Sequence, residues 1–245
     1  MGNPRFGLNM IGIDVYTFKC RVLTSLIVAL PLAICLVTLN LFEQLWTQVG
    51  TTGFVWLCAA AIAGQLGRDR GKLLEERLYA SLGGKPTTIA LRHKGSKNLV
   101  LLKHRHSRIS ELFPTIHMPT AEQEEADPMS ADAAYEAAVS LIRNRTRDRK
   151  RFHHVFEENC NYGFRRNLWG LKPVAIVVCL VSILFICAQL VFPQSTGAVS
   201  SPAVLYGLGV FFVLLLIFWI FMVNIRWLVV PANAYAERLL ESLDT

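Results

Sequence analysis

The sequence predicts an integral membrane protein of the α-helical class, with four transmembrane helices arranged as two hairpins and a small α+β cytoplasmic insertion domain. Two observations lead to this fold class. The composition is 53% hydrophobic and only 18% charged, and the apolar residues are gathered into long runs without any charge. A helix needs about 20 apolar residues to cross the hydrocarbon core of a bilayer, and the helices of soluble cores are rarely apolar over that length.

The positions of the uncharged runs define the predicted spans and the segments between them. They place spans at 22–42, 50–66, 173–192 and 204–225, of which 50–66 is the shortest. The chain is thereby divided into an N-terminal segment with the first hairpin (1–66), a cytoplasmic basic sensor domain (67–172), a second hairpin (173–225) and a cytoplasmic C-terminal helix (226–245).

The positions of the cations predict the orientation of these spans. All 25 Lys and Arg residues lie before the first span, between the second and third spans, or after the fourth. The short connections at 43–49 and 193–203 contain none of them. Because Lys and Arg are retained on the cytoplasmic side, both termini and the central segment are predicted to be cytoplasmic. The run at 22–42 is longer than the apolar region of a cleavable signal peptide, and a second span follows it at once.

The six cysteines predict neither disulfides nor a metal site. No two of them have a metal-ligand spacing such as C-x-x-C, and the cytoplasm keeps thiols reduced. We therefore expect free cysteines that behave as small hydrophobic residues.

The central segment opens with a helix and continues with a predicted β-hairpin. The helix extends from Gly67 to Ser81 and stops at Gly83 and Gly84, where glycine suits a helix end. Threonine and branched residues at 87–93 and 99–106 flank the turn "KGSKN", a pattern typical of two paired strands.

Three further helices are predicted in the same segment. A short one ends at Leu112, and a second starts with Ser130 as its cap and continues to about Thr146, with Tyr135, Val139 and Ile142 on one face. The third covers 152–168 and leads into the third span. A module of this size buries little surface by itself, so packing against neighbouring subunits is expected to stabilise it.

A short repeat follows both hairpins. The pattern E-R-L-x-x-S-L occurs at Glu76–Leu82 and again at Glu237–Leu243. Both copies are amphipathic at helical spacing, so the two helices that leave the membrane are expected to pack together. Duplication and chance similarity between two ordinary helices both explain the repeat.

The charge of the central segment indicates an anionic ligand. Residues 67–172 carry 20 Arg and Lys against 13 Asp and Glu, together with all six histidines. Flanking charges that orient a span lie within about 15–20 positions of it, and part of the basic residues lies farther away. Attraction to anionic lipid explains some of them. The residues predicted to bind a nucleic acid or nucleotide are Arg92, Lys94, Lys103, His104, Arg105, His106, Arg143, Arg145, Arg147, Arg149, Lys150 and Arg151.

Signals for an enzyme are weak in this sequence. On a strand, His104 and His106 would share a face and form an H-x-H metal pair, but a third ligand would have to come from elsewhere. The phosphate-loop, nucleophile-elbow and zinc-protease motifs are absent from the sequence. We therefore expect no catalytic residue, no metal and no cofactor.

The spans themselves argue against an ion-coupled carrier, because no Asp, Glu, Lys, Arg or His lies in their interior. A pore closed by apolar side chains agrees with this composition. Small residues four apart, as in "CAAAIAG", allow close contact between helices; association of subunits is the preferred interpretation, and packing within one subunit is equally allowed. The predicted pore or helix-packing residues are Ala59, Ala60, Ala63, Gly64, Gln65, Gly207, Gly209 and Asn224.

Two pairs of spans around a basic cytoplasmic sensor resemble the membrane effectors of bacterial anti-phage defence systems, and most of all the effector of the Hailong system. The resemblance covers the whole chain but rests on architecture and charge, so no functional residue is transferred. It implies a multi-pass protein of the bacterial inner membrane that assembles as a homo-oligomer, with a tetramer favoured, and acts like an ion channel. It also implies a DNA oligomer as ligand, made by a partner nucleotidyltransferase, whose loss releases the channel. Related four-span effectors gated by cyclic nucleotides fit almost as well.

The sequence thus predicts a non-enzymatic, oligomeric membrane effector with a cytoplasmic domain that senses a nucleic-acid oligomer or nucleotide. Two alternatives stay open. One is a membrane-bound metal-dependent enzyme that uses His104, His106, His153, His154 and Glu157 or Glu158. The other is a membrane scaffold that anchors a soluble partner through the charged segment.

Overall fold

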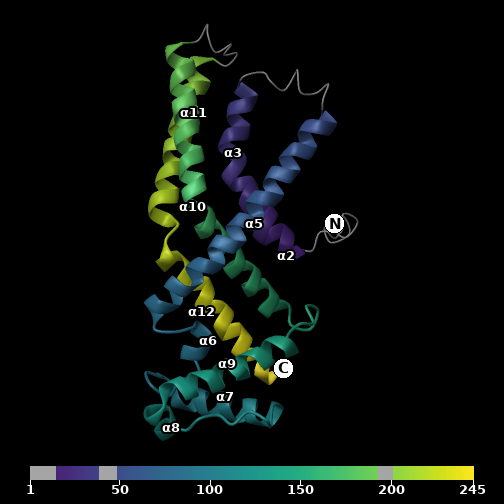
Figure 1. The fold of residues 1–245 in the computed structure, drawn as a ribbon, viewed down its shortest axis with the longest axis vertical. Coiled ribbons are helices and arrows are strands. Elements are labelled where there is room, and N and C mark those ends of the chain that lie inside the picture. The colour runs from purple at the N-terminus through teal and green to yellow at the C-terminus, as the bar shows by residue number, and fades with distance from the viewer. Residues whose placement is uncertain (1–14, 39–48, 193–200) are drawn as a thin grey trace. The chain divides into compact units, whose positions relative to one another are not determined.

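The computed structural model describes residues 15–38, 49–192 and 201–245, and of residues 49–61 it describes the backbone alone. The described residues form helices and no strand (Figure 1). In chain order the elements are α2 (Val15–Thr17), η1 (Phe18–Val22), α3 (Leu23–Thr38), α5 (Val49–Leu82), α6 (Pro86–Ile89), α7 (Leu99–Leu112), α8 (Ala121–Ala126), α9 (Pro128–Arg145), α10 (His153–Val191), α11 (Pro202–Ile217), η2 (Phe218–Met222), α12 (Ile225–Glu241) and η3 (Ser242–Asp244).

Two units share these helices. Unit 1 consists of Met1–Leu74 and Gly163–Trp227, and unit 2 of Glu75–Tyr162 and Leu228–Thr245. The chain passes from one unit to the other inside α5, α10 and α12.

Three helices among the described residues are long and apolar enough to cross a membrane. They are Phe18–Leu36, His153–Val191 and Pro202–Met222, and they contain most of three predicted spans, 22–42, 173–192 and 204–225. The prediction of a helical membrane protein is confirmed to this extent. The predicted span 50–66 lies within α5, and it stays a prediction, as do the domain boundaries and the orientation.

The predicted β-hairpin is wrong. Residues 87–93 contribute to the short helix α6 and the turn after it, and residues 99–106 form the first part of α7. The oxygen of the Asn98 side chain accepts a hydrogen bond from the Leu101 N–H at 3.0 Å, which is the capping contact of a helix start. Leu102, Arg105 and Ile109 are the buried residues of α7, and their spacing is helical.

The other predicted helices of the central segment are confirmed with small shifts. α5 ends at Leu82, and Gly83 follows it with a φ of 78°, a left-handed conformation that glycine adopts readily. α9 starts three residues earlier than predicted, because the Asp127 side chain, and not Ser130, is its cap and accepts the Ser130 N–H at 3.1 Å. The predicted face of α9, with Tyr135, Val139 and Ile142, is buried.

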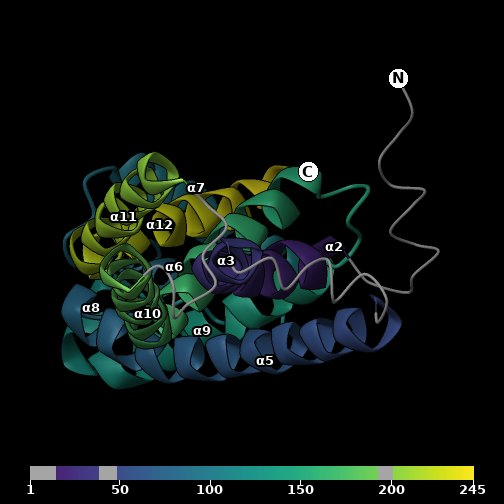
Figure 2. The same cartoon turned by 90° about the horizontal axis from the view of Figure 1, so that it is seen from above.

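A stripe of glycines on α5 organises the packing of unit 1. A Cβ atom on Gly64 would lie 3.2 Å from the Arg21 carbonyl oxygen, so α5 lies directly against the start of the first apolar helix (Figure 2). Farther along the same face, a Cβ atom on Gly71 would lie 2.9 Å from the carbonyl oxygen of Arg166 in α10. From α10, a Cβ atom on Gly170 would lie 2.6 Å from the Gly71 nitrogen. The backbones of α5 and α10 therefore touch where side chains are absent.

The predicted packing residues occupy different environments. Gly64 is buried in the contact just described, Ala63 is half-buried and Gln65 is exposed. Gly207 has open space around it, and a Cβ atom on Gly209 would be in ordinary contact with Ile186 at 3.8 Å. Ala59 and Ala60 lie where the side chains are not described.

Polar side chains secure the junction between η2 and α12. The Lys172 amine donates to the carbonyls of Ile220 and Val223, both at 2.9 Å, and so satisfies oxygens left free where the helix ends. Asn224 caps α12 by accepting the Trp227 N–H at 3.1 Å. The guanidinium of Arg165 lies 4.8 Å from the centre of the Trp227 ring, a cation–π contact, and donates to the carbonyl of the same residue.

Unit 2 has its own hydrophobic core, built from α7, α9, the first turns of α10 and the end of α12. Its largest buried side chains are Tyr135, Leu91, Ile109, Ile142 and Leu239. Both copies of the E-R-L-x-x-S-L repeat are helical. The five cysteines whose side chains the structure describes form no disulfide.

Candidate functional site

The twelve residues predicted to bind an anion fall into groups with different surroundings, all within unit 2. Some are held by contacts inside the protein, and others are exposed without such contacts. The two kinds cannot serve the same purpose, because a cation already paired with a carboxylate must lose that partner before it binds a ligand.

Arg92 belongs to the first kind. It forms a two-pronged pair with Asp132, with N–O distances of 2.8 and 2.6 Å, and donates a further hydrogen bond to the Gly83 carbonyl at 2.8 Å. The hydrogen bond to Asp132 raises the pKa of Arg92. The residue therefore fastens the turn after α5 to α9.

Next to this pair lies a buried carboxylate, Glu124, which is 6% exposed. Its oxygens accept the Tyr135 hydroxyl at 2.7 Å and the backbone N–H groups of His93 and Lys94 at 2.7 and 2.9 Å. Burial alone would raise the pKa of Glu124, but these hydrogen bonds outweigh it, so the pKa is lowered. Burial raises the pKa of Tyr135, and its hydrogen bond to Glu124 raises it further.

His106 and His104 point to different partners, because α7 is a helix. The Nε2–H of His106 donates to the Leu91 carbonyl at 2.8 Å, and its ring packs against His93 and Tyr135. His104 lies 2.8 Å from a carboxylate oxygen of Asp244. The H-x-H metal pair expected on a strand is therefore not formed.

The end of α12 and the turn that follows are held by predicted anion-binding residues. Arg105 is buried and pairs with Glu237. Arg145 donates to the Ser242 carbonyl at 2.7 Å, and Arg151 donates to the Thr245 carbonyl at 2.5 Å. Arg108, which was not among the predicted residues, donates to the Leu243 carbonyl at 3.1 Å and lies 3.6 Å from Asp244. These cations bind the protein's own polypeptide.

Aromatic residues that the sequence placed among the cations do contact them. The guanidinium of Arg149 lies 4.8 Å from the centre of the Phe156 ring. Those of Arg145 and Arg151 lie 5.6 and 5.1 Å from the centre of the buried Phe152 ring. Such contacts orient the guanidinium groups and leave part of their donors available.

Five predicted cations are both exposed and not held by contacts inside the protein. In the part of the chain that the structure describes, their side chains make no hydrogen bond or ion pair with the protein. They are Lys94, Lys103, Arg143, Arg147 and Lys150.

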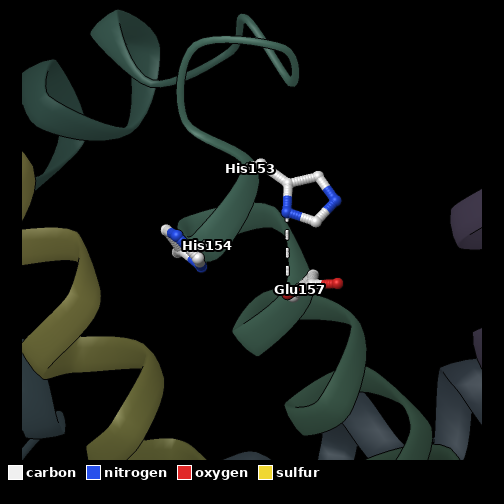
Figure 3. Close-up of side chains that lie close together, drawn as sticks. All are labelled: His153, His154 and Glu157. Atoms are coloured by element: carbon white, nitrogen blue, oxygen red, sulfur yellow. Dashed lines mark ion pairs between the residues drawn. The ribbon is translucent and has the colours of Figure 1, made fainter.

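One group of side chains has the composition of a metal site. The ligand atoms of His153, His154 and Glu157 lie within 4.8 Å of one another, at the start of α10. Figure 3 shows His153 beside Glu157, with Nδ1 and Oε2 3.6 Å apart, and His154 on a neighbouring position of the same turn. The surroundings are less suitable for a cation, because a helix N-terminus carries partial positive charge and the basic residues Arg149–Arg151 precede it directly.

The sequence did not indicate a cavity of about 260 Å³ in unit 2. Its wall is formed by the ends of α5 and α12, by α6, by α9 and by the first turns of α10. Among its residues only Arg143 was predicted as a ligand contact. A sequence signal did exist, since the lining residues Tyr79 and Tyr235 lie in or beside the repeated segment whose two copies were expected to meet.

No protein-family model, curated protein or solved structure matches this chain.

Proposed function

We propose that the chain is an oligomeric membrane effector whose basic cytoplasmic domain binds a nucleic-acid oligomer or nucleotide, and whose apolar helices form a pore controlled by that ligand. The observation that carries the proposal is the division of the cations in unit 2. Arg92, Arg105 and Arg145 stabilise the fold through contacts within the protein. A further set of exposed cations makes no such contact among the described residues.

That exposed set is where an anionic ligand would bind. Lys94, Lys103, Arg143, Arg147 and Lys150 are exposed, and the described residues offer their side chains no partner. Like charges held on one small unit repel each other, and a phosphate backbone relieves that repulsion while it releases counterions. The aromatic rings beside the guanidinium groups suit contacts with bases as well.

The membrane part supports a passive pore better than a coupled carrier. Three of its helices are long and apolar enough to span a bilayer, and the predicted spans contain no Asp, Glu, Lys, Arg or His. A pore lined by apolar side chains closes by dewetting and needs only a small helix movement to open. α5, α10 and α12 continue from unit 2 into unit 1, so they are the segments through which a bound ligand would act.

The first test is the ligand that accompanies the protein. The chain is purified in mild detergent and its absorbance at 260 nm is compared with that at 280 nm. Any excess at 260 nm is then characterised by nuclease digestion and mass spectrometry. We expect a nuclease-sensitive ligand of defined size.

The second test measures binding and its salt dependence with a fluorescein-labelled single-stranded DNA 20-mer. The variant Arg143→Gln/Arg147→Gln/Lys150→Gln should bind more weakly, and the slope of log K against log salt should be shallower by about 2, because three phosphate contacts are removed. The matched control, Arg70→Gln/Lys72→Gln/Arg77→Gln on α5, loses the same charge outside the predicted set. Equal effects in both variants, or none in either, would refute the assigned surface.

Conductance separates the pore from a scaffold. The protein is reconstituted into liposomes that contain a fluorescent dye or a potassium gradient, and flux is measured with and without the bound ligand. A ligand-dependent flux supports the proposal, whereas equal and negligible flux in both states favours an anchoring role.

A metal-dependent enzyme is the second candidate, and the group formed by His153, His154 and Glu157 is the observation that favours it. Elemental analysis of the purified protein decides between the two. One equivalent of zinc or another transition metal per chain, lost in the variant His153→Ala/Glu157→Ala, would favour the enzyme.

A further inference from the structure

The cavity in unit 2 combines aromatic, cationic and hydroxyl side chains. It is lined on one side by Tyr79 of α5 and by Tyr162 and Tyr235 of α10 and α12, and on the other by residues of α6 and α9. Its volume of about 260 Å³ lies just below the range of about 300–1,000 Å³ in which drug-sized ligands bind. There is room for one small molecule, and no room for a strand of nucleic acid.

The tyrosines provide flat surfaces for an aromatic ring. The rings of Tyr162 and Tyr235 are parallel within 5°, with centres 6.4 Å apart. The Tyr162 hydroxyl donates to Glu75 at 2.8 Å and lies 3.5 Å from the Tyr79 hydroxyl, so the inner ring is held in place. Tyr79 and Tyr235 are only half-buried, which leaves part of their rings for stacking with a ligand.

Two cations lie at the cavity, and both can meet a phosphate. Arg143 is exposed, and among the described residues its side chain has no partner. Its charge acts on the neighbouring Tyr235, whose pKa is raised by burial and held down in part by Arg143. Lys85 pairs with Glu136 at 2.6 Å, but both side chains are 45% exposed, so this pair is screened by water and exchangeable.

The hydroxyls complete the site. Thr88 is 2% exposed, and its hydroxyl has no hydrogen-bond partner among the described residues. A buried hydroxyl without a partner is unfavourable, and a ligand oxygen would satisfy it. Thr87 and Ser140 also line the cavity and offer further donors to phosphate or sugar oxygens.

We propose that this cavity binds a single nucleotide, with its base against Tyr79 and Tyr235 and its phosphate on Arg143 and Lys85. The site rests on the proposed function, since it names the place where one nucleotide unit of the ligand is recognised. It is distinct from an extended basic surface because three aromatic residues and a buried hydroxyl line a concave site.

The test is isothermal titration of the full-length protein in detergent with each of the four deoxynucleoside 5′-monophosphates, with the matching nucleosides and with orthophosphate. We expect at least one monophosphate to bind, and to bind at least ten times more tightly than orthophosphate. Binding of all four no stronger than that of orthophosphate would overturn the proposal, because the tyrosines would then contribute nothing.

Two variants test which side chains bind the phosphate and which bind the base of the ligand. Arg143→Gln should weaken binding of the monophosphate at least tenfold and leave binding of the nucleoside unchanged, whereas Tyr235→Leu should weaken both. Arg77→Gln, at an exposed position of α5 outside both the cavity and the exposed cation set, is the matched control and should bind like the parent protein. A loss in Arg77→Gln equal to that in Arg143→Gln would show general electrostatic attraction and would overturn the site.

The variant Thr88→Val tests the contribution of the buried hydroxyl to binding without destabilising the fold. Because valine removes a buried hydroxyl without a partner and keeps the shape, the melting temperature of the ligand-free protein should stay the same or rise. Binding of the monophosphate should nevertheless weaken at least threefold. Unchanged binding would show that the hydroxyl does not contact the ligand and would contradict the proposed pose.

Failure of this inference differs from failure of the proposed function. If the labelled 20-mer binds with the expected salt slope but no monophosphate binds, the cavity is not the site and the basic surface stands. If neither probe binds and no nucleic acid accompanies the purified protein, both proposals fall.

Discussion

Glu124 shows how a single buried charge fixes the geometry of unit 2. A carboxylate that is 6% exposed is costly unless every acceptor site is used, and here a hydroxyl and two backbone N–H groups come from two separate segments. The turn at His93 and Lys94 is thereby tied to α8 and α9. Arg92, next to it, is held by Asp132, whereas only the backbone of Lys94 is fixed and its side chain is exposed.

His106 gives the stability of the protein a defined pH dependence. Burial lowers the pKa of His106 in the folded state, and the hydrogen bond to the Leu91 carbonyl and the carboxylate of Glu124 oppose this effect only in part. The unfolded chain takes up the proton near pH 6.5, so the stability contributed by neutral His106 is complete above that pH and is lost as the pH falls towards the folded-state pKa. We expect the melting temperature in detergent to fall on acidification from pH 7.5 to 5.5.

The variant His106→Gln tests the assignment. Glutamine retains a donor for the Leu91 carbonyl but cannot be protonated, so the slope of stability against pH should decrease by up to about 1.4 kcal/mol per pH unit below pH 6.5. His117→Gln, at an exposed position, serves as the control. An unaltered slope in His106→Gln would mean that another titratable group causes the loss of stability at acidic pH.

At the scale of the element, the glycine stripe on α5 makes one helix contact unusually intolerant of side chains. In Gly170→Ala the new Cβ atom would lie 2.6 Å from the Gly71 nitrogen, and backbone has to move to relieve the clash. We expect a loss of about 1–3 kcal/mol, measured as a lower melting temperature of the protein in detergent.

Gly207→Ala is the matched control in another apolar helix. No atom lies within 4 Å of a Cβ atom placed there, and alanine is a better helix former than glycine. Its stability should be unchanged or slightly higher. Equal destabilisation by the two substitutions would contradict a specific contact between α5 and α10.

The same elements show what could be predicted from the sequence and what could not. The apolar runs and the helix stop at Gly83 depend on local physical chemistry, and they were predicted. Residues 99–106 were assigned to a strand, because "LVLL" is rich in branched residues. The cap contact of Asn98 and the helical spacing of Leu102, Arg105 and Ile109 decide otherwise.

The candidate site was harder to predict because its partners are distant in the sequence. Asp132 lies 40 residues from Arg92, and Glu237 lies 132 residues from Arg105. A list of cations therefore could not separate those that hold the fold from those that are free to bind. The spacing Gly67-x-x-x-Gly71 could have indicated the helix contact, but the charged residues within it concealed the signal.

At the scale of the whole molecule, the predicted orientation can be tested by chemical labelling. A cysteine placed at Lys97, an exposed position in the turn before α7, should react with a membrane-impermeant maleimide only after the inner membrane has been permeabilised. The experiment uses a background in which the native cysteines are replaced by serine or alanine. The physical reason is the positive charge of residues 67–172, which opposes their translocation.

The control places a cysteine at Ser195, between the third and fourth predicted spans. That position should be labelled in intact cells from which the outer membrane barrier has been removed. The reverse pattern at the two positions would place the basic domain outside the cytoplasm, and a cytosolic ligand could then not reach it.

The cation–π contact of Arg165 with Trp227 makes the fluorescence of this tryptophan sensitive to the arrangement of the two helices. A guanidinium 4.8 Å from the centre of an indole perturbs its excited state, and the two residues belong to α10 and α12. Any rearrangement that parts these helices will change the tryptophan emission, so such a rearrangement can be followed in real time without a dye. Replacing Arg165 by glutamine would remove that component of the emission change and show that it comes from Trp227.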